Sequence, residues 1–317
     1  MPKFTLPEGI SLHYEVVGPP LVKKDVHTFV FVHGGPGILD ARSYRYWDQF
    51  SSDAIRVLYI DQRGSGRSED PKDLSTLNIR QHAMDIHEFC KKFNLGKITI
   101  GGVSQGGYVS IAYAALFADK TAGLIVCDAE AKRDTAVRVD AYRKSLVKFF
   151  GQSSEEAERL AALVAKNDVS WDEEEYAELG KFYSKAGENF VLVRHDRTLR
   201  KFFCEEFGLF DLTPELSKIT CDVLYMLGEY DCVHPPVSAR RTRDGMTRVS
   251  SMAYYEIEDA GDPAYADKPL EVKSLVDNFL LLILNKSSLS SSDVAPASSP
   301  TEKAAGENND SFFRPSL

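Results

Sequence analysis

The sequence predicts an α/β fold in which a mostly parallel central sheet carries helices on both faces. Short runs rich in β-branched and aromatic residues recur along the chain, and some are apolar at every position, such as Phe29–Val32 and Leu124–Cys127. Such runs are typical of strands that are buried on both faces of a sheet. The stretches between the runs have helical apolar spacing, so strands and helices alternate as they do when helices connect parallel strands.

The expected elements follow from length and composition. The runs that fit strands are residues 12–17, Thr28–Val32, Ile55–Ile60, Lys97–Ile100, Gly123–Cys127, Cys221–Leu227 and Met252–Ile257. Helices are expected over Leu77–Phe93 and Gly107–Phe117, and a last one from Leu270 to about Leu284.

The composition changes in the middle of the chain and at its end. Residues 132–213 are charged and favour helices, and about eighty residues are long for a crossover, so we expect a helical cap inserted into a core of residues 1–131 and 214–286. Ordinary connecting helices are the alternative. Residues 287–317 are rich in Ser, Ala, Pro, Asn and Glu and should form a disordered tail, because they can bury little apolar surface.

Charge and composition restrict the function classes. The 317 residues carry a net charge of −9 that is spread along the chain, which argues against nucleic acid or a membrane as partner and favours a small-molecule or short-peptide substrate. The five cysteines lack metal-like or disulfide-like spacing, no apolar run approaches a membrane span, and no signal peptide is evident. We expect a cytoplasmic protein without metal or cofactor; no pattern selects an oligomeric state.

The segment Gly102-Val103-Ser104-Gln105-Gly106 lies between an expected strand and an expected helix. A strand-to-helix turn this tight strains the backbone at Ser104 and exposes its hydroxyl, while the flanking glycines relieve the crowding. The motif therefore predicts a serine nucleophile. A glycine-rich turn without chemistry is the alternative interpretation.

A second glycine-rich segment, His33-Gly34-Gly35-Pro36-Gly37, follows an earlier strand. Its backbone can direct an N–H group at a developing oxyanion, so we expect the N–H groups of Gly35 and Gln105 to form the oxyanion hole. His33 is interpreted as a structural residue that orients this loop.

These two segments and a third, Asp61-Gln62-Arg63-Gly64-Ser65-Gly66-Arg67-Ser68, resemble in order and spacing the proline iminopeptidase group of α/β-hydrolases. The resemblance covers roughly residues 10–285. It implies an α/β-hydrolase fold, a structural role for the third segment, an acid in the loop after a late strand, and a histidine in the loop before the last helix. Asp231, in Gly228-Glu229-Tyr230-Asp231, matches the acid.

The expected histidine is missing. The corresponding turn reads Ala260-Gly261-Asp262-Pro263, so Asp262 stands at the histidine position, and no histidine follows His234. A serine hydroxyl needs a neighbour that takes up its proton near neutral pH, which suits imidazole with its pKa of about 6.5 better than a carboxylate with a pKa of about 4.

Three alternatives arise from this departure. Asp231 and Asp262 could lie close enough to form a carboxylic acid–carboxylate pair, His234 could act as a substitute base, or the site could have lost hydrolysis. The sequence thus predicts a serine hydrolase-like enzyme acting on a small amide, ester or N-terminal peptide bond through Ser104, Asp231 and Asp262. The alternatives are a non-hydrolytic enzyme of secondary metabolism (isomerisation, elimination, condensation or cyclisation) and a catalytically silent ligand-binding homologue.

Overall fold

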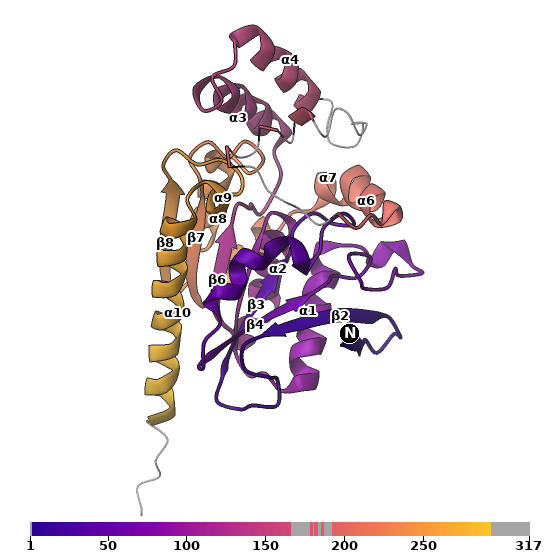
Figure 1. Ribbon diagram of the computed structural model, residues 1–317, viewed down its shortest axis with the longest axis vertical. Coiled ribbons are helices and arrows are strands. Elements are labelled where there is room, and N and C mark those ends of the chain that lie inside the picture. Colours follow the sequence, from indigo (N-terminus) through magenta and orange to yellow (C-terminus); the bar gives the residue numbers. More distant parts are fainter. Residues whose placement is uncertain (1, 166–177, 180, 183–184, 187–191, 293–317) are drawn as a thin grey trace, which may run out of the picture.

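The computed structural model describes residues 2–165, 178–179, 181–182, 185–186 and 192–292 (Figure 1). An eight-stranded sheet in the order β1-β2-β4-β3-β5-β6-β7-β8 forms its centre. The strands are β1 (Lys3–Thr5), β2 (Ser11–Val17), β3 (His27–Val32), β4 (Ile55–Ile60), β5 (Ile98–Val103), β6 (Thr121–Cys127), β7 (Asp222–Gly228) and β8 (Ser251–Ile257). Strands β3 to β8 are parallel, and β1 and β2 pair antiparallel at one end. The predicted fold class is confirmed.

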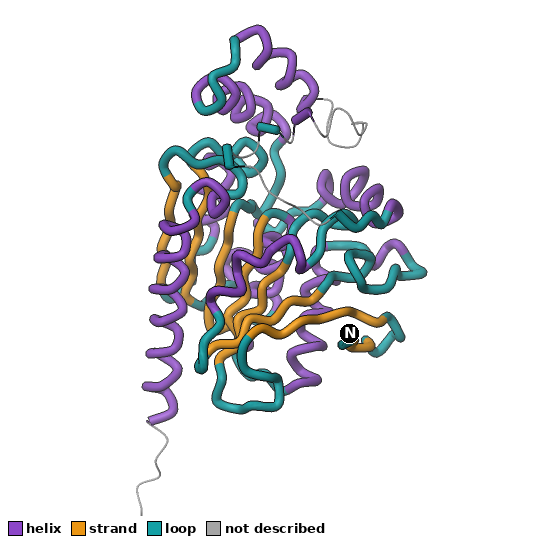
Figure 2. The backbone as a smooth tube through the Cα atoms, in the orientation of Figure 1, coloured by secondary structure: helices purple, strands orange, loops and turns teal. Residues whose placement is uncertain are grey.

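The sheet is covered on both faces, as Figure 2 shows. Alternate residues of β3 belong to different apolar clusters: Val30 and Val32 pack on one face, and Phe29 and Phe31 on the other. The first face is covered by α1 (Ile79–Phe93), α2 (Gln105–Leu116) and α8 (Pro236–Gly245), and the second by the 3-10 helix η1 (Ala41–Phe50) and α10 (Pro269–Ser292). Burial on both faces explains why the strand sequences are apolar throughout.

The helices of the middle segment lie beyond the carboxyl edge of the sheet, where α3 (Thr135–Lys148) and α4 (Ser154–Ala165) stand apart from the core in Figure 1. A second group follows: α6 (Asp196–Lys201), the π-helix η5 (Phe202–Glu206) and α7 (Phe207–Leu209). Among the described residues of this segment, the only β-type contact is an isolated bridge from Lys132 to Asp211.

The last helix is longer than the sequence predicts. α10 continues to Ser292, six residues past the expected end of the core at 286. The tail prediction is therefore wrong for residues 287–292, and residues 293–317 lie outside the described part of the chain. Serine hydroxyls here donate to carbonyl oxygens of the preceding turn, from Ser287 to Ile283 (2.9 Å) and from Ser288 to Asn285 (2.8 Å). The segment therefore remains helical although it is rich in serine.

His27, at the start of β3, predicts an acid-sensitive contribution to stability. Burial lowers the pKa of its imidazole to about 4, and its Nε2 lies 2.8 Å from the hydroxyl of Thr99. Between pH 6.5 and 4 the unfolded chain binds the extra proton, so the free energy of unfolding falls as pH falls, by up to about 3 kcal/mol. Urea unfolding at several pH values should show a smaller fall for His27→Gln. Equal falls in both proteins would contradict this assignment.

Within the described residues, no helix combines the length and apolar character needed to cross a membrane.

Candidate active site

Ser104 occupies a strained turn between β5 and α2. Its backbone angles are φ 54° and ψ −125°, a conformation that residues other than glycine rarely adopt. Its N–H donates to the carbonyl oxygens of Asp128 (2.9 Å) and Cys127 (3.2 Å), which fixes the turn to the end of β6. The Ser104 hydroxyl does not cap α2. The serine therefore has the backbone geometry of a nucleophile elbow.

The glycines around Ser104 are required by close backbone approach. A Cβ on Gly106 would lie 2.0 Å from the carbonyl oxygen of Val32, and one on Gly102 would lie 2.5 Å from the backbone of Gly106. A Cβ on Gly34 would lie 3.2 Å from that of Ser104, so the loop after β3 lies directly against the serine. The sequence-predicted elbow and glycine loop are thus brought together.

The expected oxyanion donors lie on these two segments. Gly35 has a left-handed φ of 61°, and a Cβ there would collide with the side chain of Leu39. Gln105 is the first residue of α2, a position whose N–H has no carbonyl partner within its own helix. The neighbouring Gly34 N–H donates to the Tyr44 hydroxyl (3.1 Å), which holds the loop in place.

Side chains of the Asp61–Ser68 segment support the site. The His33 ring contacts the Gly34 carbonyl oxygen through Nδ1 (2.9 Å) and accepts from the Gln62 N–H at Nε2 (3.1 Å). Gln62 in turn accepts from the Gln105 side chain (2.8 Å). Each of the two arginines of this segment pairs with acids, Arg63 with Asp85 and Glu8, and Arg67 with Asp61 and Glu15.

Three predicted residues meet at the carboxyl edge of the sheet. Asp231 and His234 lie in the loop after β7, and Asp262 lies in the loop after β8. The Nδ1 atom of His234 is 3.7 Å from Oδ2 of Asp231 and 3.9 Å from Oδ2 of Asp262. One donor atom from each residue lies within 4.8 Å of the others, which is the only grouping among the described residues with the spacing of a metal site.

His234 lies beside the first turn of α2, the helix that begins after Ser104. The Tyr108 ring packs edge-on to the His234 ring at 5.7 Å between centroids, and the Tyr108 N–H donates to the Ser104 carbonyl oxygen (3.2 Å). His234 is 1% exposed. The sequence motif thus places a buried imidazole near the elbow, on the acid-bearing loop rather than on the loop that the resemblance implies.

Burial shifts the protonation equilibria of this group. It lowers the pKa of His234 to about 4. It raises the pKa of Asp231 and of Asp262 well above the ordinary range, and the negative charge of Asp231 adds to the rise at Asp262. The imidazole is therefore held neutral, and the carboxyl groups resist carrying their full charge.

Two further acids were not identified from the sequence. Asp128 directly follows β6, and its carboxylate accepts from the N–H groups of Gly228 (3.2 Å) and Ala264 (3.1 Å), joining the loops that carry Asp231 and Asp262. Glu130 is fully buried, and burial raises its pKa. In the sequence they appear only as two acids that follow an apolar strand. Their part in the site could not be predicted, because the residues that contact them come from distant segments.

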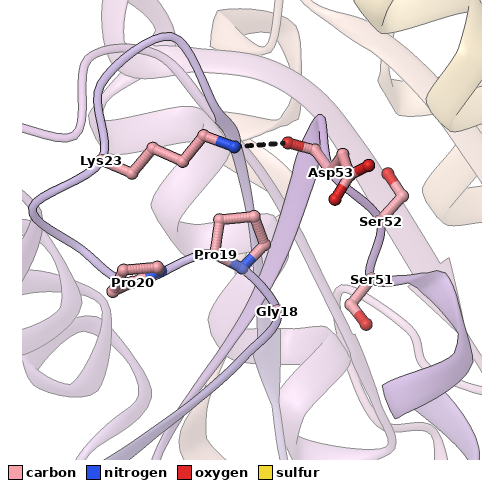
Figure 3. A pocket seen from close by; sticks show the side chains of 7 residues that line it. All are labelled: Gly18, Pro19, Pro20, Lys23, Ser51, Ser52 and Asp53. Carbon is pink, nitrogen blue, oxygen red and sulfur yellow. Dashed lines mark hydrogen bonds between the residues drawn. The ribbon is translucent and has the colours of Figure 1, made fainter.

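A cavity of about 420 Å³ lies elsewhere, between the turn after β2 and the turn before β4 (Figure 3). Its lining residues are Gly18, Pro19, Pro20, Lys23, Ser51, Ser52 and Asp53. The ammonium of Lys23 donates to the Asp53 carbonyl oxygen at 3.5 Å. This cavity is at the edge of the sheet opposite Ser104, and none of the predicted site residues lines it.

Comparison with known proteins identifies relatives of this chain. Residues 27–269 match the family described as "alpha/beta hydrolase fold". A proline iminopeptidase of Saccharolobus solfataricus is 38% identical over 122 residues, which are 37% of this chain and 37% of that protein. A proline iminopeptidase of Arabidopsis thaliana is 31% identical over 116 residues, 37% of this chain and 29% of that protein. The alignments thus span little more than a third of these relatives or less.

Solved structures share the fold over nearly the whole chain. Proline iminopeptidase from Mycobacterium smegmatis superposes with a TM-score of 0.61 at 17% identity, covering 90% of this chain and 100% of that one. An esterase from Thermogutta terrifontis gives a TM-score of 0.60 at 22% identity, covering 89% and 97%. The chain therefore belongs to the α/β-hydrolase fold family, and the part that aligns with curated proteins is similar to proline iminopeptidases.

Proposed function

We propose that this protein is a serine hydrolase of the proline iminopeptidase type that cleaves a small amide, ester or N-terminal peptide bond. Ser104 is the nucleophile, and the N–H groups of Gly35 and Gln105 form the oxyanion hole. The left-handed backbone at Ser104 and the contact of the Gly34 loop with it support these roles. The names of the relatives support the class of bond.

His234 is the base in this proposal, in place of the missing histidine after β8. The observation that carries this assignment is that its Nδ1 edge faces the carboxylates of Asp231 (3.7 Å) and Asp262 (3.9 Å). An imidazole that places its Nδ1 proton toward a carboxylate carries the Nε2 lone pair on the opposite ring edge. Burial keeps His234 neutral before the reaction, with a pKa of about 4, so the ring is free to accept a proton. Asp231 and Asp262 orient the ring, and the negative charge of Asp262 stabilises the imidazolium once it has taken up the Ser104 proton.

The steps follow from these positions. The Ser104 hydroxyl attacks the substrate carbonyl carbon while His234 takes up the hydroxyl proton, and the oxyanion receives hydrogen bonds from the two backbone N–H groups. His234 returns the proton to the leaving amine or alcohol. Water then repeats the sequence on the acyl-enzyme, which restores Ser104.

Residues 132–213 are proposed to act as a cap that limits the site to small molecules or short peptides. The α3 and α4 helices stand over the carboxyl edge of the sheet (Figure 1), and the Arg138 side chain on α3 donates to the Val233 carbonyl oxygen in the acid-bearing loop (3.1 Å). A cytoplasmic location suits the free cysteines, because the reducing cytosol keeps thiols unpaired.

Labelling with a fluorophosphonate tests the proposal. The unaltered protein should be labelled, and Ser104→Ala should remove the label completely, because the reagent forms its bond with an activated serine hydroxyl. Ser110→Ala is the matched control. This buried serine lies on α2, the helix that begins after Ser104, and its hydroxyl donates to the Gly106 carbonyl oxygen (2.8 Å), so labelling should persist. Unlabelled wild-type protein would refute an activated Ser104.

A second candidate is proton-transfer chemistry by Asp231 and Asp262 on a small molecule of secondary metabolism, without hydrolysis. The observation that favours it is the closeness of the two buried carboxyl groups, whose oxygens lie within 4.8 Å. Asp262→His separates the two candidates. If Ser104 is labelled only in this variant, the wild-type site is disarmed for serine chemistry, and the proton-transfer or binding function leads.

A further inference from the structure

Four buried carboxyl groups beside the candidate active site outnumber the two arginines whose positive charge acts on this region. We call Asp128, Glu130, Asp231 and Asp262 the carboxyl cluster; each is at most 7% exposed. Arg138, itself 2% exposed, and Arg133 contribute positive charge to this region. Buried carboxylates are costly unless they are protonated, paired or bound to a metal ion.

Oδ2 of Asp231 and Nδ1 of His234 are both buried without a hydrogen-bond partner in the described structure, as are the two carboxyl oxygens of Glu130. Asp231 and His234 are each 1% exposed. The Asp231 and His234 atoms are 3.7 Å apart, and the same Nδ1 is 3.9 Å from Oδ2 of Asp262. Three donor atoms therefore converge on one gap, and unpartnered buried atoms of this kind can mark the position of an ion.

We propose that Asp231, His234 and Asp262 form a binding site for a divalent transition-metal cation such as Zn²⁺. Two carboxylate oxygens and one imidazole nitrogen are a donor set that zinc accepts, with a fourth position left for water or substrate. Two donors bonded to one tetrahedral ion at about 2.1 Å lie roughly 3.4 Å apart, so the widest separation, within 4.8 Å, has to close by roughly 1 to 1.5 Å.

The backbone of the loop holds one ligand in position. Oδ1 of Asp231 accepts from the N–H groups of Val233 (2.9 Å) and His234 (2.7 Å), which leaves Oδ2 directed at the imidazole. Hydrogen bonds of this kind orient the ligands of known metal sites. The imidazole also makes the site selective, because Mg²⁺ and Ca²⁺ prefer oxygen ligands.

A bound metal excludes the role of His234 as a base. Coordination through Nδ1 uses the lone pair of that nitrogen, so the proton of the neutral ring moves to Nε2, which can then no longer take up the Ser104 proton. Zinc should therefore slow fluorophosphonate labelling, and a chelator should restore it. The proposed metal binding does not depend on the proposed hydrolase function. Only the inhibition of labelling by zinc rests on that function.

Calorimetric titration of ZnCl₂ into the full chain, after removal of metals with a chelator, tests the site. One zinc ion should bind per chain, and Asp262→Asn should weaken binding at least about tenfold, since even the loss of a supporting residue costs that much. Asp262→His should keep binding because it supplies another zinc ligand. MgCl₂ should not bind at this site.

Two matched controls separate ligation from general loss of charge. Asp259→Asn removes an exposed acid of the same loop, one that pairs with Lys185 at 2.9 Å, and should bind zinc like the wild type. His195→Gln removes another histidine with an acidic neighbour, Asp70 at 2.7 Å, and should also bind normally. Circular dichroism melting checks that each variant is folded.

The outcomes are distinguishable from those of the proposed function. A wild-type chain that binds no zinc, or binding that is equal in Asp262→Asn, His234→Gln and wild type, overturns the metal site. If zinc binds with the expected dependence on Asp262 and His234 but Ser104 is never labelled, the metal site stands and the serine chemistry falls. His234→Gln, which should also weaken zinc binding, keeps the test valid should Asp262→Asn fail to fold.

Discussion

Replacing His234 by glutamine should lower the rate at which a fluorophosphonate labels Ser104 by about 10²- to 10⁴-fold, the usual contribution of a general base. Glutamine is close in size and polar but cannot take up a proton near neutral pH. The effect is expected because Nδ1 of His234 faces both Asp231 and Asp262 within 4 Å. Labelling time courses on purified protein measure the rate.

His87→Gln is the control for this measurement. His87 lies on α1, stacks on Phe117 at 3.9 Å between ring centroids, and has no part in the site, so its variant should label like the wild type. If His234→Gln also labels at the wild-type rate, another group takes up the Ser104 proton. The substitute-base assignment would then be abandoned in favour of one of the carboxyl groups.

Gly106→Ala should lower the free energy of unfolding by about 4 kcal/mol or more, which is among the largest effects of a single substitution. The added Cβ would lie 2.0 Å from the Val32 carbonyl oxygen and 2.8 Å from that of His33. Both contacts are with backbone, so no side-chain rotation relieves them, and α2 has to move away from β3. Urea unfolding measures the change.

Gly208→Ala is the matched control for this substitution. Gly208 also lies in a helix, α7, but nothing is within 4 Å of the position of its added Cβ. Alanine there should be neutral or stabilising by up to about 1 kcal/mol. A Gly106→Ala protein as stable as the Gly208→Ala protein would show that the elbow tolerates separation of α2 from β3.

Most strands were predictable because they are apolar runs bounded by polar residues. The elements that were missed include β1 and the 3-10 helix η1, each for a local reason. β1 spans only Lys3–Thr5, too few residues to show a pattern, and it forms by pairing with β2. The 3-10 helix η1 buries Tyr44, Trp47 and Phe50, a spacing of three residues that signals such a helix but does not fit the α-helical period.

The candidate site was predictable where a motif carries it and not where neighbours come from distant strands. The elbow and the acid-bearing loop are continuous segments, so Ser104 and Asp231 could be selected from the sequence. Asp128 and Glu130 enter the site only because β6 lies between β5 and β7 in the sheet. That order is a property of strand pairing, and no short segment encodes it.

The loop between Asp231 and His234 is shared by two parts of the molecule. Cys232 and Val233, the residues between them, pack in an apolar cluster with Tyr142, Leu146, Ala157, Leu160, Val164 and Leu179 of the middle segment. Cys232 and Val233, which separate Asp231 from His234, are thus also part of the apolar core of the middle segment. A chimera that exchanges the helices of residues 132–213 for those of a relative has to refit these two side chains, or it changes the geometry beneath them.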